Sequence, residues 1–236
     1  MKTVTGFLTV LALCGAALSL KASNNEEQLH KAANVLSEIM RAPDKGIPRD
    51  LLRKSVCVGV VPSELKGAFI FGGTYGRGVL LCRRHGTGAW GAPSMFTLGG
   101  ANVGFQIGGE ATDVVFLVMN PEGLRKLLQD NVKLGADVSA AAGPVGRTAE
   151  GATDAEMHAE ILSYSRTRGL FAGVSLDGAV LKQDNDDNRR LYGRRVSPKD
   201  ILIRGTMESP PAARPLDRLL AKYAPHGGAP FRRYRS

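Results

Sequence analysis

The feature that most restricts the fold is a series of short, apolar, β-branched runs separated by glycine-rich gaps too short to contain a helix. A parallel strand pair needs a crossover of a dozen or more residues, whereas antiparallel strands need only a tight turn. The chain also holds 29 glycines without a collagen period, which is typical of tight turns and close strand packing. The runs therefore predict antiparallel strands at Ser55–Val61, Ala68–Phe71, Val79–Cys82, Phe96–Leu98, Asn102–Ile107, Asp113–Met119, Ile161–Ser165, Gly169–Leu176 and Ala179–Leu181.

Helical periodicity occurs in a few places between these runs. Glu26–Met40 carries apolar residues on one stripe, which predicts an amphipathic N-terminal helix. A shorter helix is expected after Pro48, another over Pro121–Asn131 with Asn120 as its cap, and a fourth over Asp184–Tyr192. The predicted fold class is α+β: an antiparallel, glycine-rich β-sheet domain with an N-terminal amphipathic helix and a few packed helices.

The first 23 residues have the pattern of a signal peptide. Lys2 forms a short positive region, Val4–Leu13 is apolar, and small residues follow near Ser19. The apolar run is shorter than a membrane span requires. Cys14 raises the alternative of a lipoprotein, but Leu13 stands where a lipobox requires a small residue, which argues against lipidation. We therefore expect an exported protein, periplasmic or secreted, that associates with a membrane surface.

Charge is distributed unevenly along the chain. Residues 24–207 hold 23 basic and 20 acidic side chains, whereas residues 208–236 hold six basic and two acidic ones. The second segment also contains five prolines and lacks a clear period, so residues 24–206 are predicted to form the domain and residues 207–236 a basic, disordered tail. A basic tail favours acidic partners such as anionic lipid or an acidic protein. The near balance of charge in the domain, together with the leader, argues against nucleic acid.

Two cysteines remain beyond the leader, Cys57 and Cys82. Both lie in predicted strands and could pair in an oxidising compartment. Sequence does not supply the geometry that a disulfide requires, so the favoured interpretation is two small buried apolar residues.

Motifs typical of catalysis are incomplete. Ser63 and Lys66 have the spacing of an acylating serine and its lysine, but the partner motifs of that class are absent. Ser175 lies in a near match to a nucleophile elbow, where Asp177 replaces a required small residue; a hairpin turn at Asp177–Gly178 explains the segment better. We therefore predict a protein without catalytic activity, with an undetected hydrolase as the weaker alternative.

Motifs for cofactors and metals are also incomplete. The glycines of Gly72–Gly78 lead into a strand, whereas a phosphate loop leads into a helix. Cys82 and His85 lack the further ligands that zinc needs, and the carboxylates around Asp184 and Asp186 lack the closing acid of a calcium loop. We expect neither a cofactor nor a metal.

Between about residues 29 and 193, the order and spacing of many small motifs resemble the SYLF-domain family. The resemblance begins at Ile47-Pro48 and Val60-Val61-Pro62, and continues through Leu134-Gly135. The positions that carry it as a structural motif are Trp90, Gly143, Pro144, Tyr164, Gly169, Phe171, Gly173, Asp184, Asn188, Tyr192 and Gly193.

This resemblance implies a phospholipid-binding module without an established enzyme activity. Eukaryotic members bind phosphoinositides, and some bind actin. The chain differs from these in its leader, in its basic tail and in lacking an SH3 or FYVE neighbour, and the leader argues against actin as a partner. The expected partner is an anionic phospholipid or membrane surface. The alternative is an envelope structural or protein-interaction module that docks an acidic partner through the tail.

The last predicted helix allows a physical assignment of residues. Asp184, Asn188 and Tyr192 are spaced by four and share one helix face, which favours a scaffold role. Arginines flank this face and recur at the end of the chain, and they are the candidate contacts to anionic headgroups. These candidates are Arg189, Arg190, Arg194, Arg195, Arg232, Arg233 and Arg235.

Overall fold

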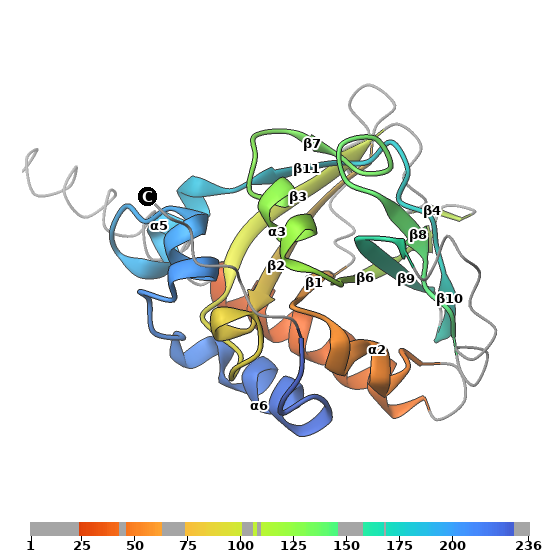
Figure 1. Ribbon diagram of the computed structural model, residues 1–236, viewed down its shortest axis with the longest axis horizontal. Coiled ribbons are helices and arrows are strands. Elements are labelled where there is room, and N and C mark those ends of the chain that lie inside the picture. The colour runs from red at the N-terminus through yellow and green to blue at the C-terminus, as the bar shows by residue number, and fades with distance from the viewer. Residues whose placement is uncertain are drawn as a thin grey trace, which may run out of the picture.

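A computed structural model describes residues 24–42, 46–62, 74–100, 106–107, 110–145, 158–167 and 169–228. Its centre is a curled sheet in which β10, β9, β6, β1, β2, β3, β11 and β7 are neighbours in that order (Figure 1). β8 also pairs with β9, and this is the one parallel pair among the described strands. The strands are β1 Cys57–Val61, β2 Thr74–Cys82, β3 Ser94–Gly100, β6 Asp113–Val118, β7 Val132–Lys133, β8 Ala140–Ala142, β9 Ile161–Thr167, β10 Leu170–Gly173 and β11 Val180–Gln183, with a separate pair of β4 Gln106–Ile107 and β5 Glu110–Ala111.

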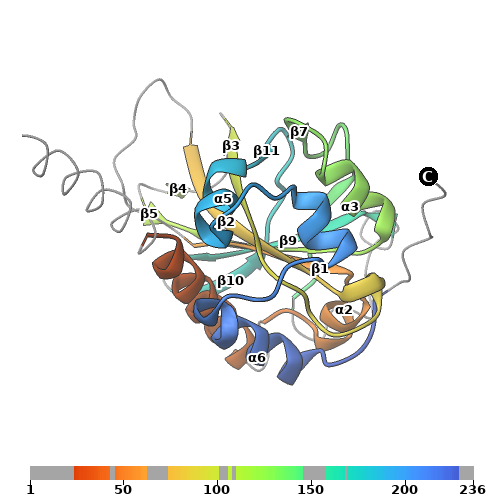
Figure 2. The same cartoon turned by 90° about the vertical axis from the view of Figure 1, so that its left-hand side faces the viewer.

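Helices cover both faces of the sheet (Figure 2). An N-terminal helix at residues 24–41, α2 (Arg49–Lys54) and α6 (Arg214–Tyr223) lie on one side. α3 (Pro121–Leu127), α5 (Asn185–Tyr192) and a π-helix (Asp200–Arg204) lie on the other, and two 3-10 turns are found at Arg84–Gly86 and Pro211–Ala213. The expected α+β class, the antiparallel sheet and the N-terminal helix are thus confirmed.

Two apolar cores result from the alternation of side chains along the strands. On β1, Val58 and Val60 pack toward the N-terminal helix and α6, whereas Cys57 and Val61 belong to the core on the opposite face. This alternation follows from the period of two in a strand. All five residues of β1 are buried because helices or loops cover both faces.

Glycines in the central strands make room for aromatic rings on neighbouring strands. A Cβ at Gly59 would lie 2.1 Å from the ring of Phe116, and one at Gly78 would lie 2.3 Å from the ring of Phe96. Each glycine is directly opposite its aromatic partner in the register. The two rings meet edge to face with centroids 5.6 Å apart. The high glycine content therefore serves core packing as well as turns.

Two predicted elements differ from the structure. The helix after Asn120 ends at Leu127, and Asn131 has a positive φ of 55°, which helical backbone does not allow. Asp177–Gly178 is a turn but not a hairpin, because β10 pairs with β9 while β11 pairs with β3 in a distant part of the sheet. The Gly178 N–H bonds instead to the Leu134 carbonyl oxygen, which joins the turn to the end of β7.

Cys57 and Cys82 form a disulfide, so the favoured interpretation of two unpaired thiols was wrong. The two cysteines are directly opposite each other in the β1–β2 register, which brings their Cα atoms to 4.0 Å. Strand pairing supplies this proximity, and no local signal at either cysteine reveals it. Both residues are buried.

The expectation of a disordered tail from residue 207 was wrong for its first part. Residues 207–228 are described, and α6 packs Leu216, Leu220 and the following Ala224 into the core with no exposed surface. Pro215 at the second position of α6 does not interrupt the helix, because the first turn requires no N–H donor there.

Several predictions lie outside the described residues. These are the leader (residues 1–23), Ser63 and Lys66, the strand at Ala68–Phe71, and the last arginines Arg232, Arg233 and Arg235. In the part of the chain that the structure describes, no helix is long and apolar enough to cross a bilayer.

Candidate functional site

The predicted scaffold face of α5 holds this helix on β3. Asp184 caps α5 by accepting a hydrogen bond of 2.8 Å from the Asp187 N–H. The fully buried Asn188 accepts 2.7 Å from the Met95 N–H, and its amide donates to Ser94 Oγ. Tyr192 donates its hydroxyl to the Pro93 carbonyl oxygen, and burial raises the pKa of this phenol. All three side chains are thus engaged in contacts that hold α5 in place.

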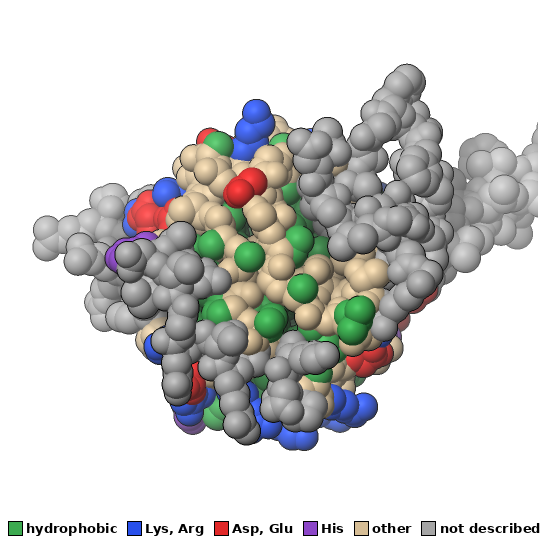
Figure 3. All heavy atoms as spheres, turned by 90° about the vertical axis from the view of Figure 1, so that its right-hand side faces the viewer, with side chains coloured by type: hydrophobic (Ala, Val, Ile, Leu, Met, Phe, Trp, Pro, Cys, Tyr) green, Lys and Arg blue, Asp and Glu red, His purple; other side chains and the backbone are tan. Residues whose placement is uncertain are grey.

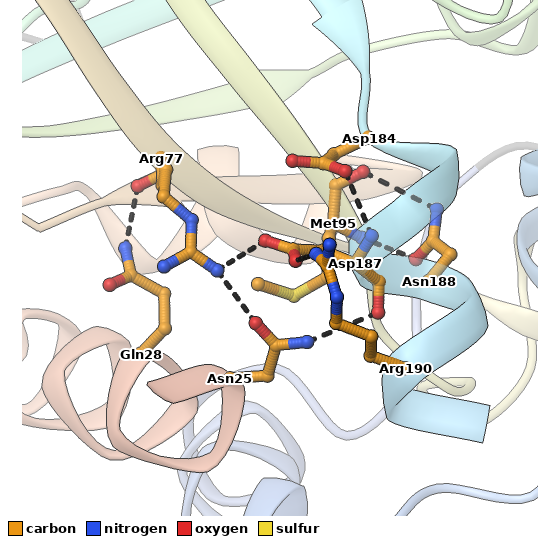
Figure 4. Close-up of polar contacts among 8 residues, drawn as sticks. All are labelled: Asn25, Gln28, Arg77, Met95, Asp184, Asp187, Asn188 and Arg190. Atoms are coloured by element: carbon orange, nitrogen blue, oxygen red, sulfur yellow. Dashed lines mark hydrogen bonds and ion pairs between the residues drawn. The ribbon is translucent and has the colours of Figure 1, made fainter. Parts of the chain in front are cut away.

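A buried polar network next to this face ties the N-terminal helix to β2 and α5 (Figure 4). Arg77 forms an ion pair with Asp187 and donates to Asn25 Oδ1 at 2.6 Å, while Gln28 donates to the Arg77 carbonyl oxygen. Asn25 also donates to the Asp187 carbonyl oxygen. Because the network joins three elements far apart in sequence, it fixes how the N-terminal helix crosses the sheet.

The candidate arginines around α5 divide into two pairs. Arg190 forms an ion pair with Asp187, and Arg189 lies 3.5 Å from Asp186, so neighbouring carboxylates partly neutralise both. Arg194 and Arg195 are exposed. Neither forms an ion pair with another described residue, although Arg194 contacts the sulfur of Met207.

The glycine-rich motif positions pack together at the β8–β9–β10 edge. A Cβ at Gly143 would lie 2.2 Å from the Tyr164 ring, and one at Gly173 would lie 2.2 Å from the Gly143 carbonyl oxygen. Pro144 is buried, and Phe171 packs against the core under the N-terminal helix. Two further motif glycines, Gly169 between β9 and β10 and Gly193 at the end of α5, have positive φ angles. The motif at this edge is therefore a packing requirement.

Trp90, the remaining motif residue, belongs to a buried cluster, and it is the only member of this cluster that the sequence motifs predicted. Its ring lies under the guanidinium of Arg83, 4.2 Å from Cζ to the centroid, and its Nε1 donates to the Ala224 carbonyl oxygen at 3.0 Å. Arg83 is itself completely buried. The guanidinium donates to carbonyl oxygens of Ser55 and Ala224 at 3.0 Å each, with a longer contact to Arg53.

This cluster joins the carboxyl-terminal ends of α2 and α6. Ser55 is the C-cap of α2 and Ala224 the C-cap of α6, and the last carbonyl groups of a helix lack partners within it. A cation at such an end is favourable because the helix dipole is negative there. Burial lowers the pKa of Arg83 to about 10, which keeps the guanidinium charged at neutral pH. No signal in the sequence distinguishes Arg83 from the exposed Arg84 beside it.

The surface created by this junction is strongly basic, and we call it the α2–α6 basic face. Lys and Arg side chains gather at the lower edge of the view in Figure 3, on the side where Figure 1 shows α2 and α6. Of the six cations that we assign to this face, Arg53 pairs with Asp50, and the other five form no ion pair with a described residue. The face consists of the exposed residues Arg49, Arg53, Lys54, Arg214, Arg218 and Lys222.

Helical spacing explains why the three cations of α6 share a surface. Arg214, Arg218 and Lys222 are four apart, opposite the buried stripe of Leu216 and Leu220. This spacing of four is present in the sequence, but the prolines of the segment led to a prediction of disorder instead of a helix with a basic face. The contribution of α2 was missed because only tertiary packing brings this helix beside α6.

Half-buried apolar side chains line the junction between the two helices. Leu51 of α2 and Leu219 and Tyr223 of α6 pack against the core and keep part of their surface exposed. Cations of both helices approach the Tyr223 ring: Arg49 Cζ lies 5.5 Å from the centroid and Lys222 Nζ lies 5.2 Å from it. The α2–α6 basic face thus has an aromatic and aliphatic centre.

The two helices contain two acidic residues, Asp50 of α2 and Asp217 of α6, and Asp217 is half-buried. Asp217 accepts a hydrogen bond from Ser209 Oγ at 2.6 Å, and burial raises the pKa of its carboxyl group. The face therefore combines six cations with one exposed carboxylate, that of Asp50.

The described residues contain no cluster of three or more His, Cys, Asp or Glu side chains able to hold a metal ion. Cys82 is in the disulfide, and Ser175 Oγ accepts a hydrogen bond from the Asp177 N–H within its own turn. Neither of these described candidate motifs is assembled into a site.

Comparison with known proteins identifies relatives over most of the chain. Residues 99–223 match the Ysc84 family, described as "Las17-binding protein actin regulator". Protein YSC84 of Saccharomyces cerevisiae is 36% identical over 207 residues, covering 84% of this chain and 44% of the yeast protein. SH3 domain-containing protein PJ696.02 of Schizosaccharomyces pombe is 36% identical over 205 residues, covering 84% of this chain and 47% of that protein.

A vertebrate relative gives the same assignment. SH3 domain-containing YSC84-like protein 1 of Xenopus laevis is 32% identical over 207 residues, covering 85% of this chain and 61% of that protein. The chain thus spans about half the length of the curated relatives it matches. Since the family match covers more than half of the chain and includes β6, β9, α5 and α6, the protein belongs to the Ysc84, or SYLF-domain, family.

Proposed function

We propose that the protein is an exported, peripheral phospholipid-binding protein that attaches to anionic membrane surfaces through the α2–α6 basic face and has no catalytic activity. The observation that carries this proposal is the exposure of six cations around a half-buried apolar centre on two adjacent helices. This combination suits a bilayer interface, where cations meet phosphate groups and a tyrosine ring lies at the headgroup level.

The electrostatic contribution can be estimated from the number of cations. A basic residue close to an anionic leaflet contributes about 1 kcal/mol, and the contribution decays within a Debye length of about 10 Å at ordinary ionic strength. The three cations of α6 therefore contribute about 3 kcal/mol at low salt. Since α6 is already folded against the core, the attraction is not reduced by ordering a loose segment.

Export is a separate part of the proposal. The leader pattern in residues 1–23 supports it, and so does the Cys57–Cys82 disulfide, because such bonds persist mainly in oxidising compartments. Cleavage by signal peptidase in a secreting host, followed by intact-mass measurement of the released protein, tests this part. A full-length protein retained in the cytoplasm with all three cysteines as free thiols would overturn it.

The second candidate function is a protein-interaction module. It is favoured by the description of the family as Las17-binding and by relatives named LAS seventeen-binding protein 3. In this case the α2–α6 basic face would dock an acidic protein surface. The two functions share the same residues and differ in the partner, so vesicle binding by the purified protein separates them.

The central experiment compares three triple variants of equal charge. In the first, Arg214, Arg218 and Lys222 of the α2–α6 basic face are changed to Gln. In the second, Arg189, Arg194 and Arg195 around α5 are changed to Gln. A third variant changes Arg232, Arg233 and Arg235 to Gln and tests the end of the chain. Each is titrated with phosphatidylcholine vesicles, with and without phosphatidylglycerol, at low and high salt.

The first variant should bind anionic vesicles at least about 100-fold more weakly at low salt, since three charges at about 1 kcal/mol each are lost. The α5 variant should lose much less affinity for these vesicles, because Arg189 already lies next to a carboxylate. Equal losses in all three variants would show that net charge alone governs binding. Absence of vesicle binding by the unmodified protein would reject the lipid proposal in favour of protein docking.

A further inference from the structure

Cations from two different helices approach the ring of Tyr223. Arg49 of α2 and Lys222 of α6 both lie within cation–π distance of the same ring. Neither cation forms an ion pair with a described carboxylate. Two cations near one ring repel each other, and an anion in contact with both would relieve this repulsion.

The phenol adds a second feature that suits an anion. An aromatic ring has a negative face and a positive edge, so cations at the ring leave the edge and the hydroxyl as the places that attract negative charge. The guanidinium of Arg49 offers a planar fork of donors, the ammonium of Lys222 offers up to three, and the phenol offers one. Phosphate oxygens accept hydrogen bonds from all three kinds of donor.

The position of the cluster indicates the source of the phosphate. Leu51 and Leu219 of the same two helices are half-buried, and four further cations are exposed on these helices. A phosphate that approaches with acyl chains behind it would place apolar groups near these leucines. A small soluble phosphate would use the cations alone.

We propose that Arg49, Lys222 and Tyr223 form a phosphate-binding site at the junction of α2 and α6, which takes the headgroup phosphate of a membrane phospholipid. This inference rests on the proposed function and adds to it a defined site within the diffuse basic face. It predicts that two of the six cations matter more than the others.

Single substitutions of equal charge test the site. Arg49→Gln and Lys222→Gln each remove one cation at the ring. Lys54→Gln and Arg214→Gln are matched controls, because each removes one exposed cation from the same two helices without a contact to Tyr223. Tyr223→Phe keeps the ring and removes the hydroxyl. Circular dichroism and thermal unfolding establish that each variant is folded before it is titrated.

With phosphatidylglycerol vesicles at low salt, each control should bind roughly fivefold more weakly, as expected for one diffuse charge. Arg49→Gln and Lys222→Gln should each bind these vesicles at least about 30-fold more weakly, because each also loses a charge-assisted hydrogen bond to the phosphate. The double variant Arg49→Gln/Lys222→Gln should show a loss of affinity smaller than the product of the two single losses, since both cations bind one phosphate. Tyr223→Phe should show a smaller loss of a few fold.

The outcomes separate this inference from the proposed function. Equal losses in all four charge variants would overturn the phosphate site while leaving diffuse attachment to membranes intact. No binding of the unmodified protein to anionic vesicles at low salt would reject both. Glycerol phosphate added as a soluble competitor should displace the protein only weakly, and efficient displacement would overturn a lipid as the source of the phosphate.

Discussion

The Cys57–Cys82 disulfide should account for a large share of the stability of the sheet. The two residues are 25 apart in sequence, and closing a loop of this length in the unfolded chain removes about 12 cal/mol/K of entropy in the chain-entropy treatment. At 25 °C this corresponds to about 3.5 kcal/mol. Domains have a total free energy of unfolding of only about 5–15 kcal/mol, so reduction should have a clear effect.

The experiment compares one polypeptide in two oxidation states, so that no core atoms are removed. A Cys14→Ser background leaves only the two cysteines of β1 and β2. Because both are buried, the protein is reduced in denaturant and then refolded with reductant present. Urea unfolding followed by circular dichroism should give a midpoint about 1–2 M lower for the reduced form, if the dependence on urea is about 2–3 kcal/mol/M.

Two results would contradict this reasoning. Equal midpoints for the oxidised and reduced forms would mean that the bond does not restrict the unfolded chain as estimated. Two titratable thiols in unreduced protein unfolded in denaturant would mean that the cysteines are not paired at all. In the second case, the support that the disulfide gives to export would be lost as well.

Three further substitutions test the packing described above. Arg83→Met should cost about 1–3 kcal/mol of unfolding free energy in urea titrations, since it leaves the buried carbonyl group of Ser55 without its guanidinium donor, while that of Ala224 keeps the Trp90 indole as a donor; an unchanged midpoint would refute the role of the guanidinium. Leu220→Ala should lower the unfolding free energy by about 2–5 kcal/mol, and an unchanged value would mean that α6 does not pack into the core. Asp217 has a raised pKa in the folded state, so its contribution favours folding at pH values below its unfolded pKa and is lost as pH rises toward the folded pKa. Asp217→Asn should therefore stabilise the protein relative to wild type more at neutral pH than in acid, and the opposite pH trend in the urea midpoints would contradict this assignment.

Local patterns were sufficient to predict the class of the fold. Short apolar runs with brief gaps exclude helical crossovers, and the central strands are antiparallel as this pattern requires. The cap at Asn120 and the shared face of Asp184, Asn188 and Tyr192 also follow from neighbouring residues, because caps and helix faces depend on spacings of three or four.

The sequence by itself therefore determined the central strands, the caps, the amphipathic N-terminal helix and the motifs of the family, since all of these depend on residues close together in the chain. Only the tertiary structure decided the pairing of Cys57 with Cys82, the burial of Arg83 and the meeting of α2 with α6. The physical reason is that strand register and helix docking join residues 25 to more than 140 positions apart, such as Arg83 and Ala224, and no local periodicity encodes such contacts. The candidate site belongs to this second class, because its cations come from two helices that become neighbours only when the chain folds.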